Sequence, residues 1–588
     1  MTLRLHEATY RYPGASTAVI RGVDLEVGAG EVTGLVGPNG AGKTTLCLIA
    51  SGLAPASIGG RLDGSVRLDG QETRDLRPFE AAARCGILFQ NPLTQLSGTT
   101  TSVWEEVAFG PANLGVAAAE ISARVAWALG AVGIADLAAR DPERLSGGQA
   151  QLVALASILA LGPRVLVLDE PTSLLDPAGT RLVGGALASL ASERGTAMVL
   201  VEHKADLLAS TAHLIARMDA GHVVQTAATG VLLADPELEA AGVAAPSPLR
   251  LARRLLASGG TLGPRVLAAL GLDAATELAE ADPDASSSPG LVPELVRATG
   301  VANGAIELDD VVFDYPGPVR ALASVSLRIK PGETVAIVGQ NGSGKSTLAR
   351  HLNGLLRPTS GRVRIDGRDI RQVHVADLAH RVGLAFQDPD RQIFAGLVRT
   401  EVAFGPRNLG VRDPELGEVV RGSLEALGLA GESETHPYDL GYSRRKLLSL
   451  ASIVALRSPV LVLDEPTTGQ DARGVAMIER LVAALAGAGR TVIAITHDMR
   501  FAAENFDRVI AMRAGQVVLD GPPGEVFAEG AWPALASTYL EPPFASVVGS
   551  RLGLGSTPTA AALAAALGGG LGAAPGGGAR GGLGEHRD

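Results

Sequence analysis

Two glycine-rich segments have the residue types and the spacing that bind phosphate groups. Residues 37–44 read GPNGAGKT and residues 339–346 read GQNGSGKS. Glycines let successive backbone N–H groups curl around phosphate oxygens, the lysine adds a positive charge, and the hydroxyl after it can bind Mg²⁺. Each segment follows a short apolar run and precedes an apolar helical pattern, which is the strand–loop–helix context that a phosphate loop requires.

Both loops are expected to contribute several contacts to a bound phosphate chain. In the first loop the candidates are Gly37, Asn39, Gly40, Gly42, Lys43, Thr44 and Thr45. In the second loop they are Gly339, Asn341, Gly342, Gly344, Lys345, Ser346 and Thr347. The hydroxyls of Thr44 and Ser346 are the candidate metal ligands among them.

Two pairs of adjacent carboxylates each end an apolar, β-prone run. Asp169-Glu170 follows residues 165–168, and the same pair recurs as Asp464-Glu465. Acids at the end of a buried strand are costly without a cation, so we expect Asp169 and Asp464 to bind Mg²⁺ together with the loop hydroxyls. Glu170 and Glu465 then lie where a base could polarise an attacking water molecule.

The chain repeats these features in the same order, which indicates a duplicated domain. Three matching pairs are GLVGPNGAGKTTL and AIVGQNGSGKSTL, VLVLDEPTSLLDP and VLVLDEPTTGQDA, and AFGPANLGV and AFGPRNLGV. We expect a first copy over residues 1–245, a linker or appendage over 246–303, a second copy over 304–540, and a Gly/Ala-rich tail over 541–588 that is largely disordered. PSPLRLARRL after the first copy and PPFASVVGSRL after the second are weakly alike, so each copy is expected to carry a small appendage.

Composition excludes several classes of protein. The net charge of the 588 residues is −11, which argues against a nucleic-acid partner bound through bulk positive charge. Two cysteines, Cys47 and Cys85, are too few for a disulfide framework or a zinc site. No stretch of about 20 residues is free of charges and helix breakers, and the N-terminus lacks the pattern of a signal peptide, so we expect any transmembrane part to lie on other chains.

With these motifs in place, the chain resembles the ATP-binding-cassette (ABC) ATPase family over nearly its whole length. The specific mark is LSGGQ at residues 145–149, the signature of that family. The resemblance implies two α/β P-loop domains, each with a small antiparallel β subdomain and a helical subdomain, which bind ATP and Mg²⁺. It also implies an intramolecular dimer in which the P-loop of one domain faces the signature of the other.

The resemblance assigns further residues in both copies. It implies that Gln90 and Gln387 are the Q-loop glutamines, which also reach the metal. By the same resemblance, His203 and His497 are switch histidines at the γ-phosphate, Asp176 and Asp471 are D-loop acids, and Tyr12 and Tyr315 stack on adenine. The expected signature contacts to ATP are Ser146, Gly147, Gly148 and Gln149.

The second copy departs from the signature, because LGYSR stands at residues 440–444. The register is secure, since LASIVA at 450–455 matches LASILA at 155–160. Tyr442 replaces a glycine, so close approach of the backbone to a phosphate is in doubt. Head-to-tail pairing then predicts a consensus site at Lys345 and a degenerate site at Lys43, and we expect the Lys345 site to carry most of the turnover, unless Ser443 or Arg444 replaces the missing signature groups.

Segments 89–96 and 386–394, together with the two AFGPxNLG segments, resemble the energy-coupling factor (ECF) group of importer ATPases, which includes the cobalt and nickel ATPases. That resemblance implies a peripheral protein on the cytoplasmic face of the cell membrane. Its implied partners are an integral membrane scaffold and a small substrate-binding membrane protein, with a vitamin, a pyrimidine precursor, cobalt or nickel as cargo. A sugar-type importer ATPase is the alternative. A soluble translation-factor type is disfavoured, because residues 246–303 hold five arginines, no lysine and six acids.

Overall fold

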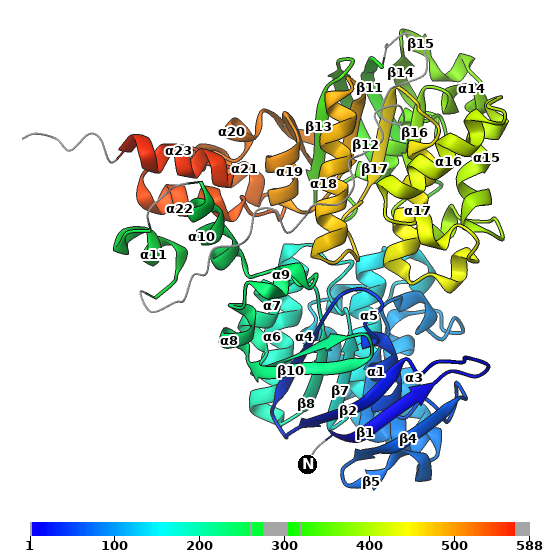
Figure 1. Ribbon diagram of the computed structural model, residues 1–588, viewed down its shortest axis with the longest axis vertical. Coiled ribbons are helices and arrows are strands. Elements are labelled where there is room, and N and C mark those ends of the chain that lie inside the picture. Colours follow the sequence, from blue (N-terminus) through cyan, green and yellow to red (C-terminus); the bar gives the residue numbers. More distant parts are fainter. Residues whose placement is uncertain (1–2, 259–261, 274–303, 318, 571–588) are drawn as a thin grey trace, which may run out of the picture.

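The computed structural model describes residues 3–258, 262–273, 304–317 and 319–570. Each copy contains one four-stranded and one six-stranded sheet, and the two copies lie one above the other along the long axis of the molecule (Figure 1). This arrangement confirms the predicted α/β class with two P-loop domains.

The first copy pairs an antiparallel sheet with a mostly parallel one. The smaller sheet has the order β2-β1-β4-β5, with β1 Leu3–Arg11, β2 Ile20–Val27, β4 Arg61–Leu68 and β5 Gln71–Glu72. The larger sheet has the order β10-β9-β3-β8-β7-β6, with β3 Val32–Val36, β6 Cys85–Leu88, β7 Val165–Asp169, β8 Ala197–Val201, β9 Leu214–Asp219 and β10 His222–Ala228. Within it, β10 alone runs antiparallel to its neighbour.

The second copy repeats both sheets. Its smaller sheet has the order β12-β11-β14-β15, with β11 Ile306–Asp314, β12 Arg320–Ile329, β14 Ser360–Ile365 and β15 Arg368–Asp369. Its larger sheet has the order β16-β17-β18-β13-β19-β20, with β13 Thr334–Gly339, β16 Val382–Ala385, β17 Val460–Asp464, β18 Thr491–Ile495, β19 Arg508–Arg513 and β20 Gln516–Gly521.

Helices cover the sheets in the same sequence in both copies. The first copy and its appendage contain α1 Lys43–Ala50, α2 Pro78–Arg84, α3 Val103–Asn113, α4 Ala118–Ala131, α5 Gly147–Leu161, α6 Pro177–Arg194, α7 Ala205–Thr211, α8 Thr229–Leu233, α9 Glu237–Ala240, α10 Ser247–Ala257 and α11 Pro264–Leu270. The second contains α13 Lys345–Leu352, α14 Val375–Ala379, α15 Val398–Asn408, α16 Glu415–Ala426, α17 Tyr442–Val454, α18 Ala472–Gly487, α19 Met499–Asn505, α20 Pro523–Val526, α21 Trp532–Ala536, α22 Phe544–Leu552 and α23 Ala560–Gly570. Among the short 3₁₀ helices, η2 spans Pro92–Thr94 and η6 spans Pro389–Arg391.

The parallel strands form where the sequence has short, continuous apolar runs. Every residue of β3, β7, β8, β17 and β18 is buried. Strands covered by helices on both faces have this pattern, whereas half-exposed strands alternate. Because such strands end at one edge of the sheet, the residues that follow them are brought together there.

The helical subdomain of each copy packs on the helix that follows its signature segment. In the first copy, α3 and α4 pack on α5, and in the second, α15 and α16 pack on α17. Helix α5 begins with a capping box in which Ser146 Oγ accepts from Gln149 N at 3.3 Å and Gln149 Oε1 accepts from Ser146 N at 3.1 Å. It ends at Gly162, whose φ of 66° is readily adopted by glycine.

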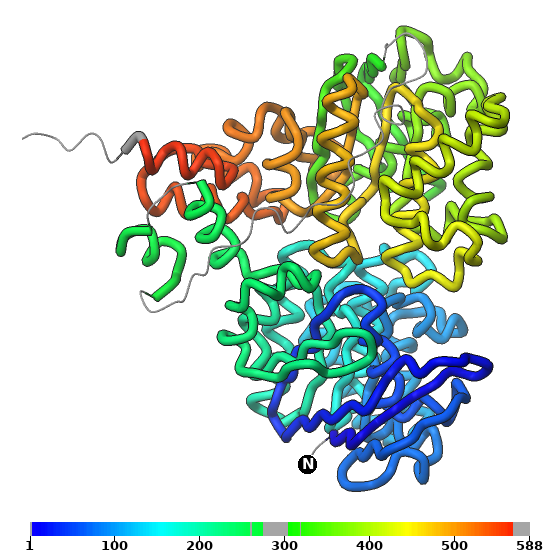
Figure 2. Tube along the Cα trace, in the orientation of Figure 1, coloured from blue at the N-terminus to red at the C-terminus, as the bar shows by residue number. Residues whose placement is uncertain are grey.

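The two appendages form one joint lobe beside the copies. Leu251 and Leu255 of α10 and Leu270 of α11 share an apolar cluster with Val548 of α22 and Leu563 of α23. In Figure 2 the green trace of the first appendage lies beside the red end of the chain. The expectation of one small appendage per copy therefore corresponds to the helix pairs α10–α11 and α22–α23.

The predicted tail disorder is wrong for residues 544–552 and 560–570, which are helical. The physical reason is that Val548 and Leu563 find apolar partners on the other appendage, which composition counted along one segment does not reveal. Residues 571–588 of the predicted tail lie outside the described residues, as do residues 274–303 of the predicted linker. In the described part of the chain, no helix is both long enough and apolar enough to cross a membrane.

Candidate active sites

The two phosphate loops have the same geometry. Lys43 Nζ donates to the carbonyls of Gly37 at 2.8 Å and Pro38 at 3.0 Å. Lys345 Nζ donates to Gly339 O at 2.7 Å and to the next carbonyl at 2.9 Å. Burial lowers the pKa of both ammonium groups, and nearby carboxylates oppose this shift. Each lysine is thus held inside a curled loop at the start of a helix, where a phosphate would displace the carbonyl contacts.

The glycine before each lysine is required by the backbone. Gly42 and Gly344 precede α1 and α13 with φ of 101° and 103°. A Cβ on Gly344 would lie 2.5 Å from Ala321 O, so no side chain fits there. By contrast, Gly40 and Gly342 have φ of 84° and 81° with open space around them, at the part of each loop that faces the opposite copy.

The first acid of each pair lies next to the hydroxyl of its own loop. Ser346 Oγ donates to Asp464 Oδ1 at 3.3 Å, and the Thr44 hydroxyl bonds to Asp169. Burial, and then the charge of the adjacent glutamate, raise the pKa of Asp169 to about 7 and that of Asp464 to about 6. A buried carboxylate beside a hydroxyl fits Mg²⁺, which binds proteins through few ligands and takes the rest from substrate phosphates and water.

The second acid of each pair contacts the predicted switch histidine. His203 Nε2 lies 3.2 Å from Glu170 Oε1, and His497 Nδ1 lies 2.8 Å from Glu465 Oε2. Burial opposes ionisation of both carboxyls, but the nearby histidine and the loop lysine outweigh it and hold the pKa of Glu170 and of Glu465 below the usual value. Both glutamates are therefore ionised at neutral pH, as a general base must be.

Backbone strain marks the same two positions. Glu170 and Glu465 have φ of 53° and 50°, a left-handed conformation that non-glycine residues seldom adopt. The strain turns each carboxylate from the end of its strand toward the histidine that follows the neighbouring strand. The sequence predicted that the glutamate and the histidine of each copy act at the same site, and the structure places the two side chains in contact.

The two glutamines of the Q-loop segments differ in their surroundings. Gln90 bonds to Glu170 through its side chain, whereas Gln387 is exposed and is held by its backbone. The residue that holds it, Lys446, was missed by sequence reasoning. Its fully buried Nζ donates to the carbonyls of Phe386, Gln387 and Asp464, at 3.0 Å to the first and 3.1 Å to the last.

A sequence signal for Lys446 was present. It and Gln151 each lie four residues before the matching LASI segments, so they occupy equivalent positions. Gln151 Nε2 donates to Glu170 O at 3.3 Å. The substitution of a neutral amide by a cation in the second copy therefore links the Q-loop backbone to the acidic strand in that copy.

The loop of each copy faces the signature segment of the other. Asn39 Nδ2 donates to Ser443 Oγ at 2.8 Å, and Asn39 N donates to Asp471 Oδ2 at 3.0 Å. On the opposite side, Asn341 Nδ2 donates to Leu174 O at 3.2 Å, and a Cβ on Gly148 would lie 2.9 Å from that amide. These contacts are the head-to-tail pairing of the two copies within one chain.

The altered signature lacks the side chain that caps the helix, and it adds a hydroxyl that hydrogen-bonds to both copies. Helix α17 begins at Tyr442 after Gly441, which has no side chain to cap it, whereas Ser146 caps α5. Ser443, at the position of Gly148, donates to Gln470 Oε1 at 2.9 Å as well as accepting from Asn39. Arg444 pairs with Glu432 within its own copy.

The remaining predicted contacts lie at the edges of the sites. The hydroxyl of Tyr12 is 3.1 Å from Thr45 Oγ1, and that of Tyr315 is 3.2 Å from Thr347 Oγ1, so both rings lie beside their phosphate loops. The side-chain oxygen of Gln149 accepts the Ser146 N–H in the α5 capping box. Asp176 caps α6 by accepting from Gly179 N at 2.8 Å, as Asp471 caps α18. Adenine stacking by the two tyrosines stays a prediction.

Comparisons with known proteins agree on the family. The family described as ABC transporter matches residues 20–173 and 322–468. An ABC transporter ATP-binding protein of Methanosarcina acetivorans is 38% identical over 536 residues, covering 90% of this chain and 86% of the relative. Another of Caldanaerobacter subterraneus is 35% identical, covering 93% and 95%. The solved structure of cbiO1 from Clostridium perfringens, described as part of the ABC transporter complex cbiONQ, is 34% identical with a TM-score of 0.36, covering 39% of this chain and 93% of that one.

Proposed function

The chain belongs to the ABC transporter family of ATP-binding proteins, and on this premise we propose that it powers a membrane importer of the ECF type. Its enzymatic activity is ATP hydrolysis. In the proposal, residues 1–245 and 304–540 are the two ATPase domains, docked peripherally on the cytoplasmic face of the membrane. Their partners are an integral membrane scaffold and a small membrane protein that binds a vitamin, a pyrimidine precursor, cobalt or nickel.

An exposed aromatic pair in the second copy carries the proposal. Phe394 follows η6 and Phe404 lies on α15, and their side chains are 62% and 48% exposed. The rings make an edge-to-face contact with centroids 4.6 Å apart. Two large apolar side chains packed on each other in water mark a binding surface for an apolar partner. They lie in the two segments that resemble the ECF group.

The first copy also exposes apolar side chains on the elements that correspond to η6 and α15. Leu93 on η2 and Phe109 on α3 are 58% and 44% exposed. A scaffold that presents two apolar helices to the paired copies would fit one into each surface. Closure of the copies on ATP would then move both helices together.

Hydrolysis is proposed to be unequal at the two sites. At the Lys345 site, Ser146 caps α5, and Gly148 in the first turn of that helix faces Asn341. At the Lys43 site, the equivalent place is filled by Ser443, which is already bonded to Asn39 and Gln470. In the proposal, a γ-phosphate therefore meets the N-terminal N–H groups of a signature helix at the Lys345 site, and meets the Ser443 side chain at the Lys43 site.

Within the Lys345 site, each residue has a defined task. Ser346, Asp464 and Gln387 would hold Mg²⁺, as Thr44, Asp169 and Gln90 would at the other site, and the ion neutralises charge on the phosphate oxygens. Glu465 accepts a proton from the attacking water, and His497 orients that carboxylate and donates toward the γ-phosphate.

The proposal is tested by affinity purification of the full chain from detergent-solubilised membranes, with mass spectrometry of the co-purified proteins. We expect a multi-spanning membrane protein and a small hydrophobic one. F394S/F404S should lose both while keeping ATP hydrolysis by the purified chain, and V231S, at an exposed valine of α8, should retain them.

Other outcomes decide between the alternatives. Recovery of two different multi-spanning proteins with no small one would favour a sugar-type importer. Recovery of ribosomes without membrane proteins would overturn the transporter proposal and favour the translation-factor type. Neither outcome changes the assignment of the chain as an ATPase.

A further inference from the structure

Helix α10 of the first appendage lies between the two helices that follow the switch histidines. At its start, Ser247 N and Ser247 Oγ donate to the two carboxylate oxygens of Asp206 at 2.7 and 2.6 Å. Asp206 lies on α7, three residues after His203. The N-terminal end of α10 is therefore fixed to the switch segment of its own copy.

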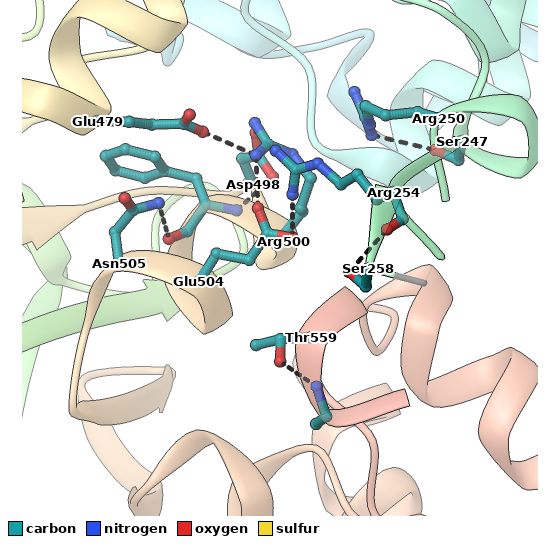
Figure 3. Close-up of polar contacts among 12 residues, drawn as sticks. Ser247, Arg250, Arg254, Ser258, Glu479, Asp498, Arg500, Glu504, Asn505 and Thr559 are labelled. Atoms are coloured by element: carbon teal, nitrogen blue, oxygen red, sulfur yellow. Dashed lines mark hydrogen bonds and ion pairs between the residues drawn. The ribbon is translucent and has the colours of Figure 1, made fainter. Parts of the chain in front are cut away.

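The other end of α10 reaches the second copy. Arg254 pairs with Glu504 Oε1 of α19, and Glu504 Oε2 lies 2.8 Å from Arg500 Nη1. The same guanidinium nitrogen of Arg500 lies 2.7 Å from Glu479 Oε1 on α18. Figure 3 shows Arg254 extending from α10 toward this group of charged side chains.

This charged network ends next to the switch histidine. Arg500 Nη2 lies 3.9 Å from Asp498 Oδ2, and Asp498 Oδ1 accepts from Phe501 N at 2.9 Å to cap α19. Burial opposes ionisation of Asp498, but Arg500 and then the α19 backbone outweigh it and keep the pKa of that carboxyl low. Asp498 directly follows His497, whose Nδ1 contacts Glu465.

The two copies hold their switch segments by different means. In the first copy, Glu202 Oε1 accepts from the backbone N–H groups of His203 and Lys204 at 2.8 and 3.1 Å. In the second copy, Thr496 stands in place of that glutamate, and its hydroxyl accepts from Asp498 N at 3.0 Å. A neutral hydroxyl is a weaker anchor than a buried carboxylate, and the Arg500 network is the charged support that the second copy adds.

The network is one-sided. In the second appendage, the equivalents of Ser247, Arg250 and Arg254 are Phe544, Val547 and Arg551. Arg551 Nη1 donates to Ala269 O on α11 at 2.8 Å, so it binds within the appendage lobe instead of reaching α7.

Burial makes this ion network stronger than an exposed pair. The side chains of Arg500, Glu504 and Glu479 are only 19%, 16% and 22% exposed, while Arg254 is 42% exposed. Isolated surface pairs contribute little, but networks of partly buried charges with good geometry are exceptions.

We propose that Arg254 is a positioning residue of the Lys345 site, acting from the first appendage through Glu504 and Arg500 on the segment that carries His497. The site with the intact signature thereby depends on α10 being docked against α19. Because α10 is also fixed to α7, the position of one switch segment is transmitted to the other. This inference rests on the proposed assignment of His497 and Glu465 to the more active site.

The test is steady-state ATP hydrolysis by the purified full chain. We expect Arg254→Ala to lower kcat about three- to tenfold with KM for ATP changed less than about twofold, because the contact orients a group that acts in the transition state. Arg254→Lys should restore at least half of the wild-type kcat, since an ammonium can still pair with one carboxylate. In an E504Q background, Arg254→Ala should have no further effect, because the two residues act in series.

Arg551→Ala is the matched control, because it removes an arginine from the equivalent place in the other appendage. It should leave kcat within about twofold of wild type. The thermal midpoints of the two variants should be equally close to that of the wild type. Equal losses of kcat in the two variants would mean that only docking of the lobe matters, and the proposal would be overturned. Additive effects of R254A and E504Q would also overturn it.

A further variant separates this inference from the proposed function. If Glu465→Gln nearly abolishes turnover while Arg254→Ala is silent, the positioning role is wrong and the site assignment stands. If Glu465→Gln itself is silent, the assignment of the more active site is wrong.

Discussion

Asn39 of the first phosphate loop donates to Ser443 of the opposite signature segment at 2.8 Å, directly across the interface between the copies. The same hydroxyl donates to Gln470, and Asn39 N is held by Asp471. The degenerate site is therefore closed by hydrogen bonds to a side-chain hydroxyl, whereas the equivalent residue at the consensus site is Gly148, which has no side chain and lies against the Asn341 amide. At the Lys43 site a γ-phosphate must compete with these bonds to the signature segment and the D-loop acid, whereas at the Lys345 site Asn341 donates to Leu174 O and not to the signature segment.

Restoring the signature should activate the Lys43 site. In a Glu465→Gln background, where remaining turnover comes from that site, G441S/Y442G/S443G returns the helix cap and removes the bridging hydroxyl. We expect hydrolysis to rise about tenfold. One well-placed donor to a charge that develops in the transition state usually changes the rate by at least that factor. Phosphate release measures it, and S443G alone should give a smaller rise. No change in the triple variant would mean that the signature does not limit this site.

Removing one base at a time should separate the two sites. Glu465→Gln keeps the side-chain volume but cannot accept a proton, so we expect steady-state hydrolysis to fall about a hundredfold or more. Glu170→Gln should leave at least half of it, because the Lys43 site faces the altered signature. ATP binding, measured by equilibrium dialysis, should persist in both. The reverse order of effects would contradict the proposed asymmetry.

Lys446 should be needed for hydrolysis at the Lys345 site. Lys446→Gln leaves at least one of the three carbonyls without its donor, which costs about 1–3 kcal/mol where the carbonyl is buried, as Asp464 O is. The change also frees the Q-loop backbone at Gln387. We expect turnover to fall about tenfold, since 1.4 kcal/mol of lost positioning corresponds to that factor, and the Mg²⁺ concentration for half-maximal rate to rise.

The reciprocal change supplies the control for Lys446. Gln151→Lys alters the equivalent position of the first copy, whose site contributes little, so steady-state turnover should stay within about twofold. A Lys446→Gln protein with wild-type turnover and Mg²⁺ dependence would show that the lysine only fills space.

The repeated motifs predicted much of the fold and the sites, because the phosphate loops and acidic strands require particular residues at fixed spacing. Lys43 and Asp169 were placed by local sequence alone. Lys446 was missed, although its equivalence with Gln151 was readable, because a lysine inside a helical pattern is usually solvated. Arg254 could not be assigned at all, since its partner Glu504 is 250 residues away and no local pattern links them.

Charge at Asp464 should destabilise the nucleotide-free protein at neutral and higher pH. The pKa of this carboxyl is raised from 3.8 to about 6, mainly by burial. The folded state therefore binds the proton more tightly than the unfolded state, and the penalty grows as pH rises from about 3.8 to about 6 and is constant above. Asp464→Asn should thus stabilise the chelator-treated protein by about 1–3 kcal/mol at pH 8 and by less at pH 4.5. Thermal unfolding at both pH values measures this, with the exposed Asp439→Asn as a control expected to change little at either. A gain independent of pH, or a loss at pH 8, would show that the Asp464 charge is already compensated within the site.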